Sequence, residues 1–406
     1  MSWFYRRFVR PVLFERDSES IHDWTIQRLA WISRNRILCE AAASFFEPPG
    51  MPVHLFGLSF PNPVGLAAGM DKYAAALPAW AALGFGFSEL GGVTWHPQPG
   101  NPPPRLFRAV ADGALINRMG FNNPGAEAMA KALAEWHAAK SWPKHPAGIN
   151  LGKSKATPLD QAAEDYAATL QILWPHADFF VVNVSSPNTP NLRQLQDKAA
   201  LDEILAAVQE VNRKEAATAR GSNGLAVSTP HGADPNRQSP IAHRRLPIHR
   251  PSGKPILVKV APDLSFEALD EILELADSRR IAGIVATNTT IARPETTDSQ
   301  SQQIYSQEGG LSGRPLRERS TEMVRHIFLQ TSGRLPVIGV GGIFNAADAW
   351  EKIIAGASLV QVYTGLVYEG PGIAREIVVG LREKLVQAGL TRIQEAVGSA
   401  KVVRHA

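Results

Sequence analysis

The residues of this chain that could do chemistry are amides and lysines near the ends of short apolar runs, together with a pair of serines. An amide offers a hydrogen-bond donor and an acceptor side by side, which suits a planar heterocycle with alternating N–H and C=O edges, such as a pyrimidine or a flavin. The five amides are Asn117, Asn150, Asn183, Asn188 and Asn288.

Two lysines and two glycine-rich stretches accompany the amides. Of Lys72 and Lys259, one could neutralise a substrate carboxylate and the other the negative charge on a reduced flavin ring. Gly339–Gly342 and Tyr363–Gly365 would expose backbone N–H groups to a phosphate, so a phosphorylated cofactor is expected. Singly, a strand-end Asn or a Gly-Gly pair is more often a turn former. Together on one rim, these residues predict a cofactor-dependent enzyme.

The elements that must position them alternate regularly after residue 60. Several strand candidates are continuous apolar runs, which is typical of parallel strands covered on both faces. The candidates are Val64–Ala67, Phe87–Val93, Ala147–Leu151, Phe179–Val184, Ile256–Val260, Gly283–Thr287, Val337–Val340 and Leu359–Tyr363. Helical patterns lie between them, for example Pro158–Leu173, Leu201–Arg213, Phe266–Asp277 and Ala346–Ala355. Eight such units predict an α/β fold, a (β/α)₈ TIM barrel, whose site lies at the carboxyl ends of the strands. The alternative is an open doubly wound sheet, but its G-x-G-x-x-G turn is missing.

The first 50 residues do not follow this rhythm and predict an N-terminal helical extension before a barrel of residues 51–395. Ser20 could cap a helix that extends to Trp31. Ile37–Phe46 predicts a second helix, whose apolar residues lie on one face. The pair could simply close the barrel's bottom or side. Alternatively, the arginines and aromatics at the start could lie on a membrane surface. The stretch 223–251 reads as a mobile insertion at the bottom face, without a catalytic role.

Composition narrows the function classes. The 406 residues are 44% hydrophobic and 20% charged, as in an ordinary globular protein. The net charge of +4 comes from the start of the chain and from the 223–251 stretch, so a nucleic-acid-binding face is not expected. The sequence contains no apolar stretch of about 20 residues, so a membrane-spanning helix is not expected. A single cysteine, Cys39, excludes an internal disulfide, a cysteine-ligated iron–sulfur cluster and a usual zinc site, and no metal is expected.

At these residues the chain resembles dihydroorotate dehydrogenase of the quinone-dependent, membrane-associated class. The matching motifs follow one another in family order over about 300 residues. They include GLAAGMDK (65–72), PQPGNPPPRLFR (97–108), INRMGFNN (116–123), NLGKSK (150–155), VNVSSPNTPNLR (182–193), VKVAPDL (258–264), ATNTT (286–290), GGLSGRPL (309–316), GVGGI (339–343) and GASLVQVYTGL (356–366). The stretch at 8–25 also resembles the helical extension of that class.

The resemblance implies oxidation of (S)-dihydroorotate to orotate in pyrimidine biosynthesis, with FMN as cofactor and a quinone as electron acceptor. The implied flavin contacts are Ala67, Ala68, Gly69, Gly92, Asn150, Asn183, Lys259, Thr287, Gly313, Gly342, Tyr363 and Thr364. The implied pyrimidine contacts are Lys72, Asn117, Arg118, Met119, Gly120, Phe121, Asn183, Asn188, Asn288 and Thr289. His22, Arg108 and Tyr363 match positions that line the quinone tunnel in relatives.

Ser186 matches the family's catalytic base. The cytosolic class carries cysteine there, and Cys39 lies in the predicted extension, so the resemblance implies the membrane-associated class without an iron–sulfur partner subunit. A peripheral place on the cytoplasmic side of a bacterial inner membrane is expected. One departure is Gly92, where the family usually has Ser or Thr and gains one more hydroxyl contact to the flavin.

Three other functions remain as alternatives. Another flavin barrel would be a dihydropyrimidine or 2-hydroxy-acid oxidoreductase, but the latter is expected to show a catalytic His and paired Arg at the late strands. A non-redox phosphate-binding barrel, such as an isomerase or lyase, would be colourless. A membrane-surface interaction protein with a decayed barrel would not keep an intact polar rim.

Overall fold

The computed structural model describes residues 2–222 and 253–400, and the insertion predicted at 223–251 lies outside them. Eight strands form a closed barrel in the order β3, β4, β7, β8, β9, β10, β12, β13, and every pair in it is parallel. They are β3 (Val64–Leu66), β4 (Phe87–Val93), β7 (Ala147–Leu151), β8 (Phe179–Asn183), β9 (Ile256–Val260), β10 (Gly283–Ala286), β12 (Val337–Val340) and β13 (Ala357–Val362). The predicted (β/α)₈ barrel is confirmed, and the open-sheet alternative is wrong because β13 pairs with β3.

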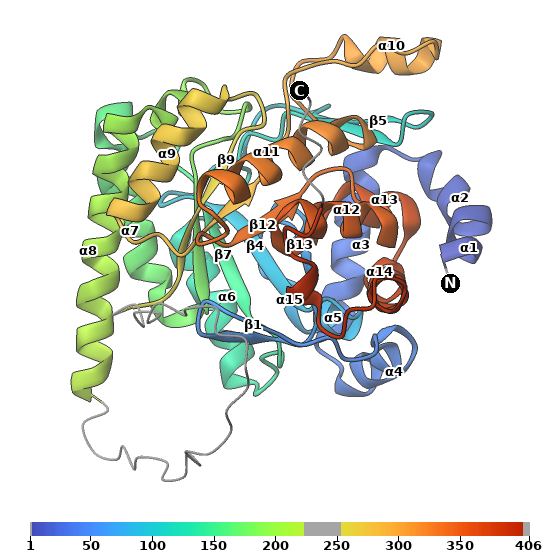
Figure 1. Ribbon diagram of the computed structural model, residues 1–406, viewed down its shortest axis with the longest axis horizontal. Helices are drawn as coiled ribbons and strands as arrows, with labels where there is room; N and C mark the ends of the chain where they lie inside the picture. Colours follow the sequence, from blue (N-terminus) through green and yellow to red (C-terminus); the bar gives the residue numbers. More distant parts are fainter. Residues whose placement is uncertain (1, 223–252, 401–406) are drawn as a thin grey trace.

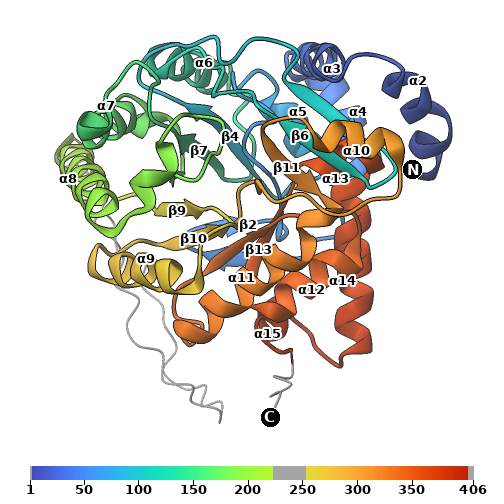
Figure 2. The ribbon, with the colours of Figure 1, turned by 90° about the horizontal axis from the view of Figure 1, so that it is seen from above.

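A ring of helices surrounds the strands and buries their outer faces (Figures 1 and 2). Its members and the shorter helices near them are α5 (Leu77–Ala82), α6 (Ala126–Ala138), α7 (Ala162–Leu173), α8 (Lys198–Ser222), α9 (Phe266–Ser278), α10 (Ser299–Tyr305), α11 (Arg317–Gln330), α12 (Ala346–Ala355), α13 (Thr364–Glu369), α14 (Ile373–Gln387) and α15 (Ile393–Ala396). Short 3₁₀ helices are η2 (Leu159–Gln161), η3 (Trp174–His176), η4 (Leu192–Gln196) and η5 (Arg314–Leu316). The four predicted helices named above correspond to η2 with α7, to α8, to α9 and to α12.

The amino-terminal end of the barrel is filled by aromatic side chains. The hairpin of β1 (Val53–Leu55) and β2 (Leu58–Phe60) brings Phe60 within 5.4 Å of the Phe87 ring, measured between centroids. Phe87 in turn lies 6.4 Å from Phe179. Glycine makes room for these rings, because a Cβ on Gly148 would lie 2.2 Å from Phe179. With this end packed, any cavity must open at the opposite end.

A three-stranded antiparallel sheet lies outside the barrel. It consists of β5 (Leu106–Ala109), β6 (Ala114–Asn117) and β11 (Gly310–Gly313), with β6 in the middle. The sequence pattern predicted no strand in these segments. The sheet sets Asn117 beside Gly310, so that two strand-end loops distant in sequence meet.

The N-terminal extension is helical, as predicted. It contains α1 (Ser2–Phe4), η1 (Tyr5–Val9), α2 (Arg10–Phe14), α3 (Ser18–Ser33) and α4 (Arg36–Phe46). The predicted cap at Ser20 is wrong. Asp17 is the N-cap of α3, and its carboxylate accepts from the Ser20 N–H at 2.8 Å. Across 2–222 and 253–400, no helix combines the length and the apolar character that crossing a bilayer requires. The boundary near residue 50 stays a prediction.

Ion pairs and hydrogen bonds attach the extension to the barrel. Glu19 of α3 accepts three hydrogen bonds from the Arg105 guanidinium, and both side chains are mostly buried. The Ser33 hydroxyl accepts from the N–H of Ala79 in α5. At the chain's start, the Tyr5 hydroxyl donates to the Val367 carbonyl of α13. The start of the extension therefore lies against the same end of the barrel as the strand-end loops, whereas the end of α4 lies beside Gly84, which precedes β4.

Candidate active site

One cavity opens at the carboxyl ends of the barrel strands, enclosing about 1050 Å³ between the protein atoms when its mouth is included. It collects nearly all the residues implied for the flavin and the pyrimidine. Those on its wall are Ala67, Ala68, Gly69, Lys72, Gly92, Asn117, Met119, Gly120, Phe121, Asn150, Asn183, Ser186, Asn188, Lys259, Thr287, Asn288, Thr289, Gly313, Gly342, Tyr363 and Thr364. The rim predicted from strand ends is thus a single site, although the role of each residue stays a prediction.

Three amides of this site, Asn150, Asn183 and Asn288, form a hydrogen-bonded chain, and the other two, Asn117 and Asn188, form a separate pair. The Asn183 amide donates to Asn150 Oδ1 at 2.8 Å. The Asn288 amide donates to Asn183 Oδ1 at 3.2 Å and to the Ser185 hydroxyl at 2.9 Å. On the other wall, the Asn188 amide donates to Asn117 Oδ1 at 3.0 Å. Hydrogen bonds among the amides hold each side chain in one orientation before any ligand binds.

Lys72 lies in the cavity wall and is almost fully buried. Burial lowers its pKa to about 8, because the charged form loses hydration. Glu19 and Asp23 on α3 oppose that shift, and Arg105 adds to it. The extension therefore contributes charges to the environment of this lysine.

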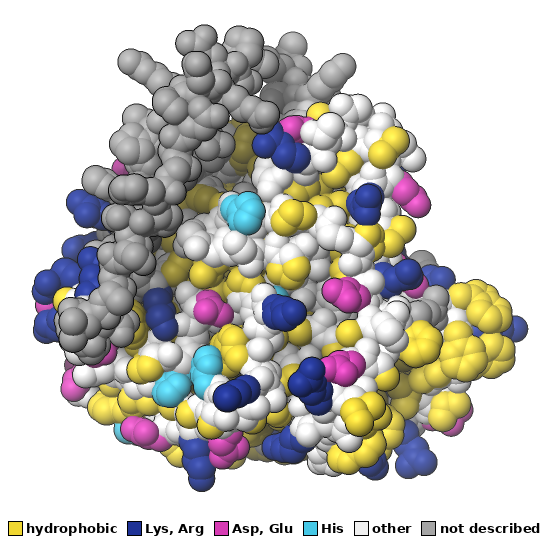
Figure 3. Space-filling view, turned by 90° about the horizontal axis from the view of Figure 1, so that it is seen from below, with side chains coloured by type: hydrophobic (Ala, Val, Ile, Leu, Met, Phe, Trp, Pro, Cys, Tyr) yellow, Lys and Arg dark blue, Asp and Glu magenta, His cyan; other side chains and the backbone are white. Residues whose placement is uncertain are grey.

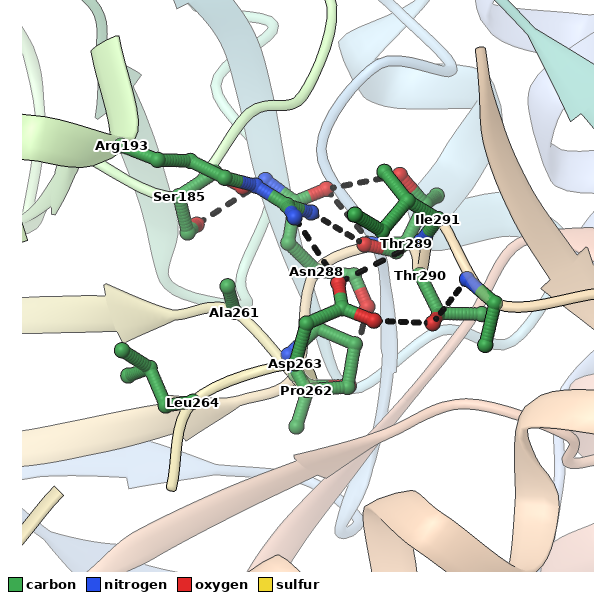
Figure 4. Close-up of polar contacts among 12 residues, drawn as sticks. Ser185, Arg193, Ala261, Pro262, Asp263, Leu264, Asn288, Thr289, Thr290 and Ile291 are labelled. Carbon is green, nitrogen blue, oxygen red and sulfur yellow. Dashed lines mark hydrogen bonds and ion pairs between the residues drawn. The ribbon is translucent and has the colours of Figure 1, made fainter. Parts of the chain in front are cut away.

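Ser186 stands on the loop after β8, and a clamp holds this loop in place. The Arg193 guanidinium donates to the carbonyl oxygens of Ser185 and Thr289 and pairs with Asp263 at 2.9 Å, as Figure 4 shows. Asp263 also accepts from the Thr290 hydroxyl. Loops after β8, β9 and β10 are thereby tied to one guanidinium, whose rigid fork of donors suits this task.

The glycine stretch after β12 lines the cavity, and its role as a phosphate cradle stays a prediction. Gly341 and Gly342 have φ of 122° and 70°, which favour glycine and turn successive backbone groups into a concavity. Among the hydrogen bonds formed within the described part of the chain, none uses the N–H of Gly341 or Gly342. Both residues line the cavity, so these donors are available to an anion.

Gly92 has no room for a larger residue. A Cβ here would lie 2.7 Å from the Phe121 ring and 3.1 Å from Asn150 Oδ1. Phe121 itself lines the cavity. The departure from the family's usual Ser or Thr therefore goes with a ring that occupies the space of that side chain.

Three of the predicted site residues are not on the cavity wall. The Arg118 guanidinium donates to Gln307 and to the Pro104 carbonyl instead. Arg108 binds the extension, donating to Ser18 Oγ and to the Arg16 carbonyl. His22 lies on α3, where burial and then the charge of Lys72 lower its pKa to about 3. Of the three implied quinone-tunnel residues, only Tyr363 lines the cavity, and burial raises its pKa to about 12.

Sequence reasoning missed two polar residues deeper in the barrel. Gln361 lines the cavity, and Glu89 is fully buried beneath it. Both lie within strands that were read only as apolar runs. The signal that could have found them is the alternation of residues, because Glu89 is two positions from the inward-facing Phe87. The other lining residues that were not predicted are Ser312, Leu316, Ile343 and Val362, whereas Val340, Gly341 and Gly365 belong to the glycine-rich stretches predicted to bind a phosphate.

Comparison with known proteins agrees with the site. Residues 51–385 match the family described as dihydroorotate dehydrogenase. A dihydroorotate dehydrogenase (quinone) from Gloeobacter violaceus is 48% identical over 97% of this chain and 98% of its own length. One from Nostoc punctiforme is 47% identical, with 97% of each chain covered. The crystal structure of DHODH in complex with ferulenol from Eimeria tenella superposes with a TM-score of 0.76 at 35% identity, covering 94% of this chain and 95% of that one. With that match extending over the barrel and the strand-end loops alike, the chain belongs to the dihydroorotate dehydrogenase family.

Proposed function

We propose that this chain oxidises (S)-dihydroorotate to orotate in pyrimidine biosynthesis, with FMN as cofactor and a membrane quinone as the final electron acceptor. Family membership supports the reaction. The observation that carries the proposal is the convergence of the amide chain, Lys72, Lys259 and Ser186 on one cavity at the strand ends.

The cavity suits FMN in two respects. The free N–H groups of Gly341 and Gly342 offer a place for its phosphate, at the end of the barrel where such groups commonly bind. Gln361 Oε1 is buried without a partner in the described chain, and a ring N–H would satisfy it. Bound there, FMN would accept a hydride from the substrate. The residues proposed to hold it are Ala67, Ala68, Gly69, Gly92, Asn150, Asn183, Lys259, Thr287, Gly313, Gly342, Tyr363 and Thr364.

The same cavity suits a small anionic pyrimidine. Lys72 would pair with the carboxylate, and the amides of Asn117 and Asn188 would face the ring's N–H and C=O groups. Asn188 Oδ1 is buried and without a partner in the described residues, so it is ready to accept from a ligand. Fixed amides reduce the entropy lost in reaching the reacting geometry. Asn183, Asn288, Thr289, Met119, Gly120 and Phe121 are proposed to complete this site, with Arg118 contributing through its backbone.

Ser186 is proposed to take the proton that leaves substrate carbon when the hydride departs. Its side chain is almost buried, and its Oγ accepts a weak hydrogen bond from the Asn188 N–H at 3.3 Å. A serine hydroxyl is a poor base alone, so the proton must move on through a hydrogen-bonded chain or water. The Arg193 clamp keeps the loop that carries this hydroxyl in place.

The extension is proposed to be the membrane-binding surface and the route of the quinone. Exposed large apolar side chains gather on it, namely Trp3, Phe4, Phe8, Val12, Trp24, Trp31, Ile37 and Phe45. Figure 3 shows apolar side chains along the right-hand edge, the side on which α1, α2 and α4 lie in Figure 1. Apolar patches of this kind beside arginines suit a lipid headgroup region. We propose peripheral attachment to the cytoplasmic side of a bacterial inner membrane.

A visible spectrum of the purified protein tests the proposal most directly. We expect flavin absorption bands, and we expect dihydroorotate to bleach them without oxygen, since the substrate's hydride reduces the ring. Lactate and dihydrouracil serve as controls for the other flavin barrels. A colourless protein, or bleaching by a control but not by dihydroorotate, would overturn the assignment.

Replacement of the proposed base tests its role. We expect Ser186→Ala to keep FMN and orotate binding but to lose about 10²-fold or more in the rate of flavin reduction, because the leaving proton has no acceptor. Stopped-flow absorbance measures this step. Ser306→Ala is the control, because Ser306 is exposed just after α10 and does not line the cavity. A near-normal rate in Ser186→Ala removes Ser186 from this role.

The pH dependence of orotate binding tests Lys72. Below pH 8 the lysine is mostly protonated and should bind the carboxylate with constant affinity. Above that pH, Kd should rise by about tenfold per unit, because binding then has to draw a proton onto the amine. Lys72→Met should bind weakly with no such slope, whereas the exposed Lys155→Met should behave as wild type. An unchanged slope in Lys72→Met would assign the titration to another group.

Removing exposed apolar side chains tests the membrane surface. Trp31, Ile37 and Phe45 are 62%, 75% and 62% exposed. Changing all three to serine should lower vesicle binding by at least about tenfold, since each loses apolar area that would enter the headgroup region. Flavin reduction by dihydroorotate should stay normal. Leu329→Ser with Val386→Ser, at exposed sites on α11 and α14, is the control. Equal vesicle sedimentation of all forms would contradict the proposed surface.

A further inference from the structure

We propose that Glu89 is a positioning residue, whose carboxylate sets the direction of the amide chain and holds the Lys259 ammonium beneath the cavity. This inference rests on the proposed function and deepens it. Glu89 does not line the cavity, and nothing in the reaction described above uses it.

Glu89 lies in the middle of β4 and is fully buried inside the barrel. Its partners come from three other strands. The Asn150 amide of β7 donates to Oε1 at 2.6 Å, and the Gln361 amide of β13 donates to Oε2 at 2.6 Å. The Lys259 ammonium of β9 lies 3.6 Å from Oε1. A buried charge is tolerated only with such partners, so these contacts form as a set.

The carboxylate decides which way the amides point. An ionised carboxylate only accepts hydrogen bonds, so the NH₂ groups of Asn150 and Gln361 must face it. The oxygen of Asn150 is then left to accept from Asn183 at 2.8 Å. The oxygen of Asn183 accepts in turn from Asn288 and from the Ser185 hydroxyl. Amide oxygen and nitrogen have nearly the same shape, so without an acceptor-only group at its end this chain could run in either direction.

Glu89 fixes the orientation of the Gln361 amide as well, and Gln361 itself lines the cavity. With its NH₂ group held by Glu89, its oxygen is the free end, and that atom is buried without a partner in the described residues. The wall therefore presents an acceptor at Gln361. A ligand edge that offers an N–H would match it, and an edge that offers a carbonyl would be rejected.

Glu89 also balances the charge of Lys259, whose side chain is 6% exposed. An ammonium in the wall stabilises a reduced, anionic flavin, and a neighbouring carboxylate reduces that effect. Removing the negative charge should therefore raise the midpoint potential of the bound flavin. A role confined to packing would not move that potential.

The experiment compares Glu89→Gln with the wild-type holoenzyme. We expect a positive shift of the flavin midpoint potential, measured by spectroelectrochemistry. We also expect the Kd of orotate, measured from the flavin spectrum, to rise about tenfold as the amide directions are lost. Asp165→Asn is the control, because Asp165 is equally buried and accepts from the Ser154 N–H and the Thr157 hydroxyl, outside the cavity wall. An unchanged or negative potential, or the same shift in the control, would overturn the proposal.

Glu89→Asp separates charge from position and serves if Glu89→Gln does not fold. Its shorter side chain keeps the charge but not the reach to Asn150 and Gln361. We expect a potential near that of wild type with weakened orotate binding, whereas unchanged orotate binding would overturn the positioning role. A wild-type protein without flavin would defeat the proposed function itself. A wild type bleached by dihydroorotate, with indifferent Glu89 variants, would defeat only this inference.

Discussion

The pairing of β13 with β3 closes the barrel, and every feature of the site depends on it. Val360 lies beside Val64, so the two ends of the strand series become neighbours. Closure turns the carboxyl ends of all eight strands toward one axis, where short polar side chains can meet across the ring. Glu89 on β4 reaches Gln361 on β13 only because the sheet returns to itself. In an open sheet these two strands could not share an enclosed interior.

The buried lysines Lys259 and Lys72 have different electrostatic environments. Lys259 has a carboxylate 3.6 Å away and lies in the barrel interior. For Lys72, burial outweighs the opposing charges on α3 and lowers its pKa to about 8. A lysine paired with a carboxylate keeps its positive charge whether or not a ligand is bound. A buried lysine whose charge is poorly compensated is stabilised most when an anionic ligand binds. The division fits a steady cofactor contact at Lys259 and a substrate contact at Lys72.

The strands and the cavity wall could be predicted because both follow from local pattern. Apolar runs indicate strands, and polar residues after them must share one rim if the sheet closes. Interactions that depend on distant partners could not be predicted. Nothing near Leu106–Ala109 indicates an antiparallel sheet completed by Gly310–Gly313. Asp17 and Ser20 are both good capping residues, so the residue types alone do not show which of them begins α3. The backbone conformation at Asp17 makes it the N-cap. The role of Glu89 was missed because a single charged residue inside an apolar run does not reveal which side chains of other strands will contact it.

The hydrogen bonds from Arg105 to Glu19 give the extension a second role besides the proposed membrane attachment. Arg105 also donates to the carbonyl of Asn101, whose own amide reaches the Asn188 carbonyl on the Ser186 loop. Helix α3 is thus part of the scaffold around the proposed substrate site. A shortened enzyme prepared without it, for ease of purification, would display an altered pocket. Inhibitors ranked against that shortened form would be selected for a shape and charge that the intact enzyme does not have.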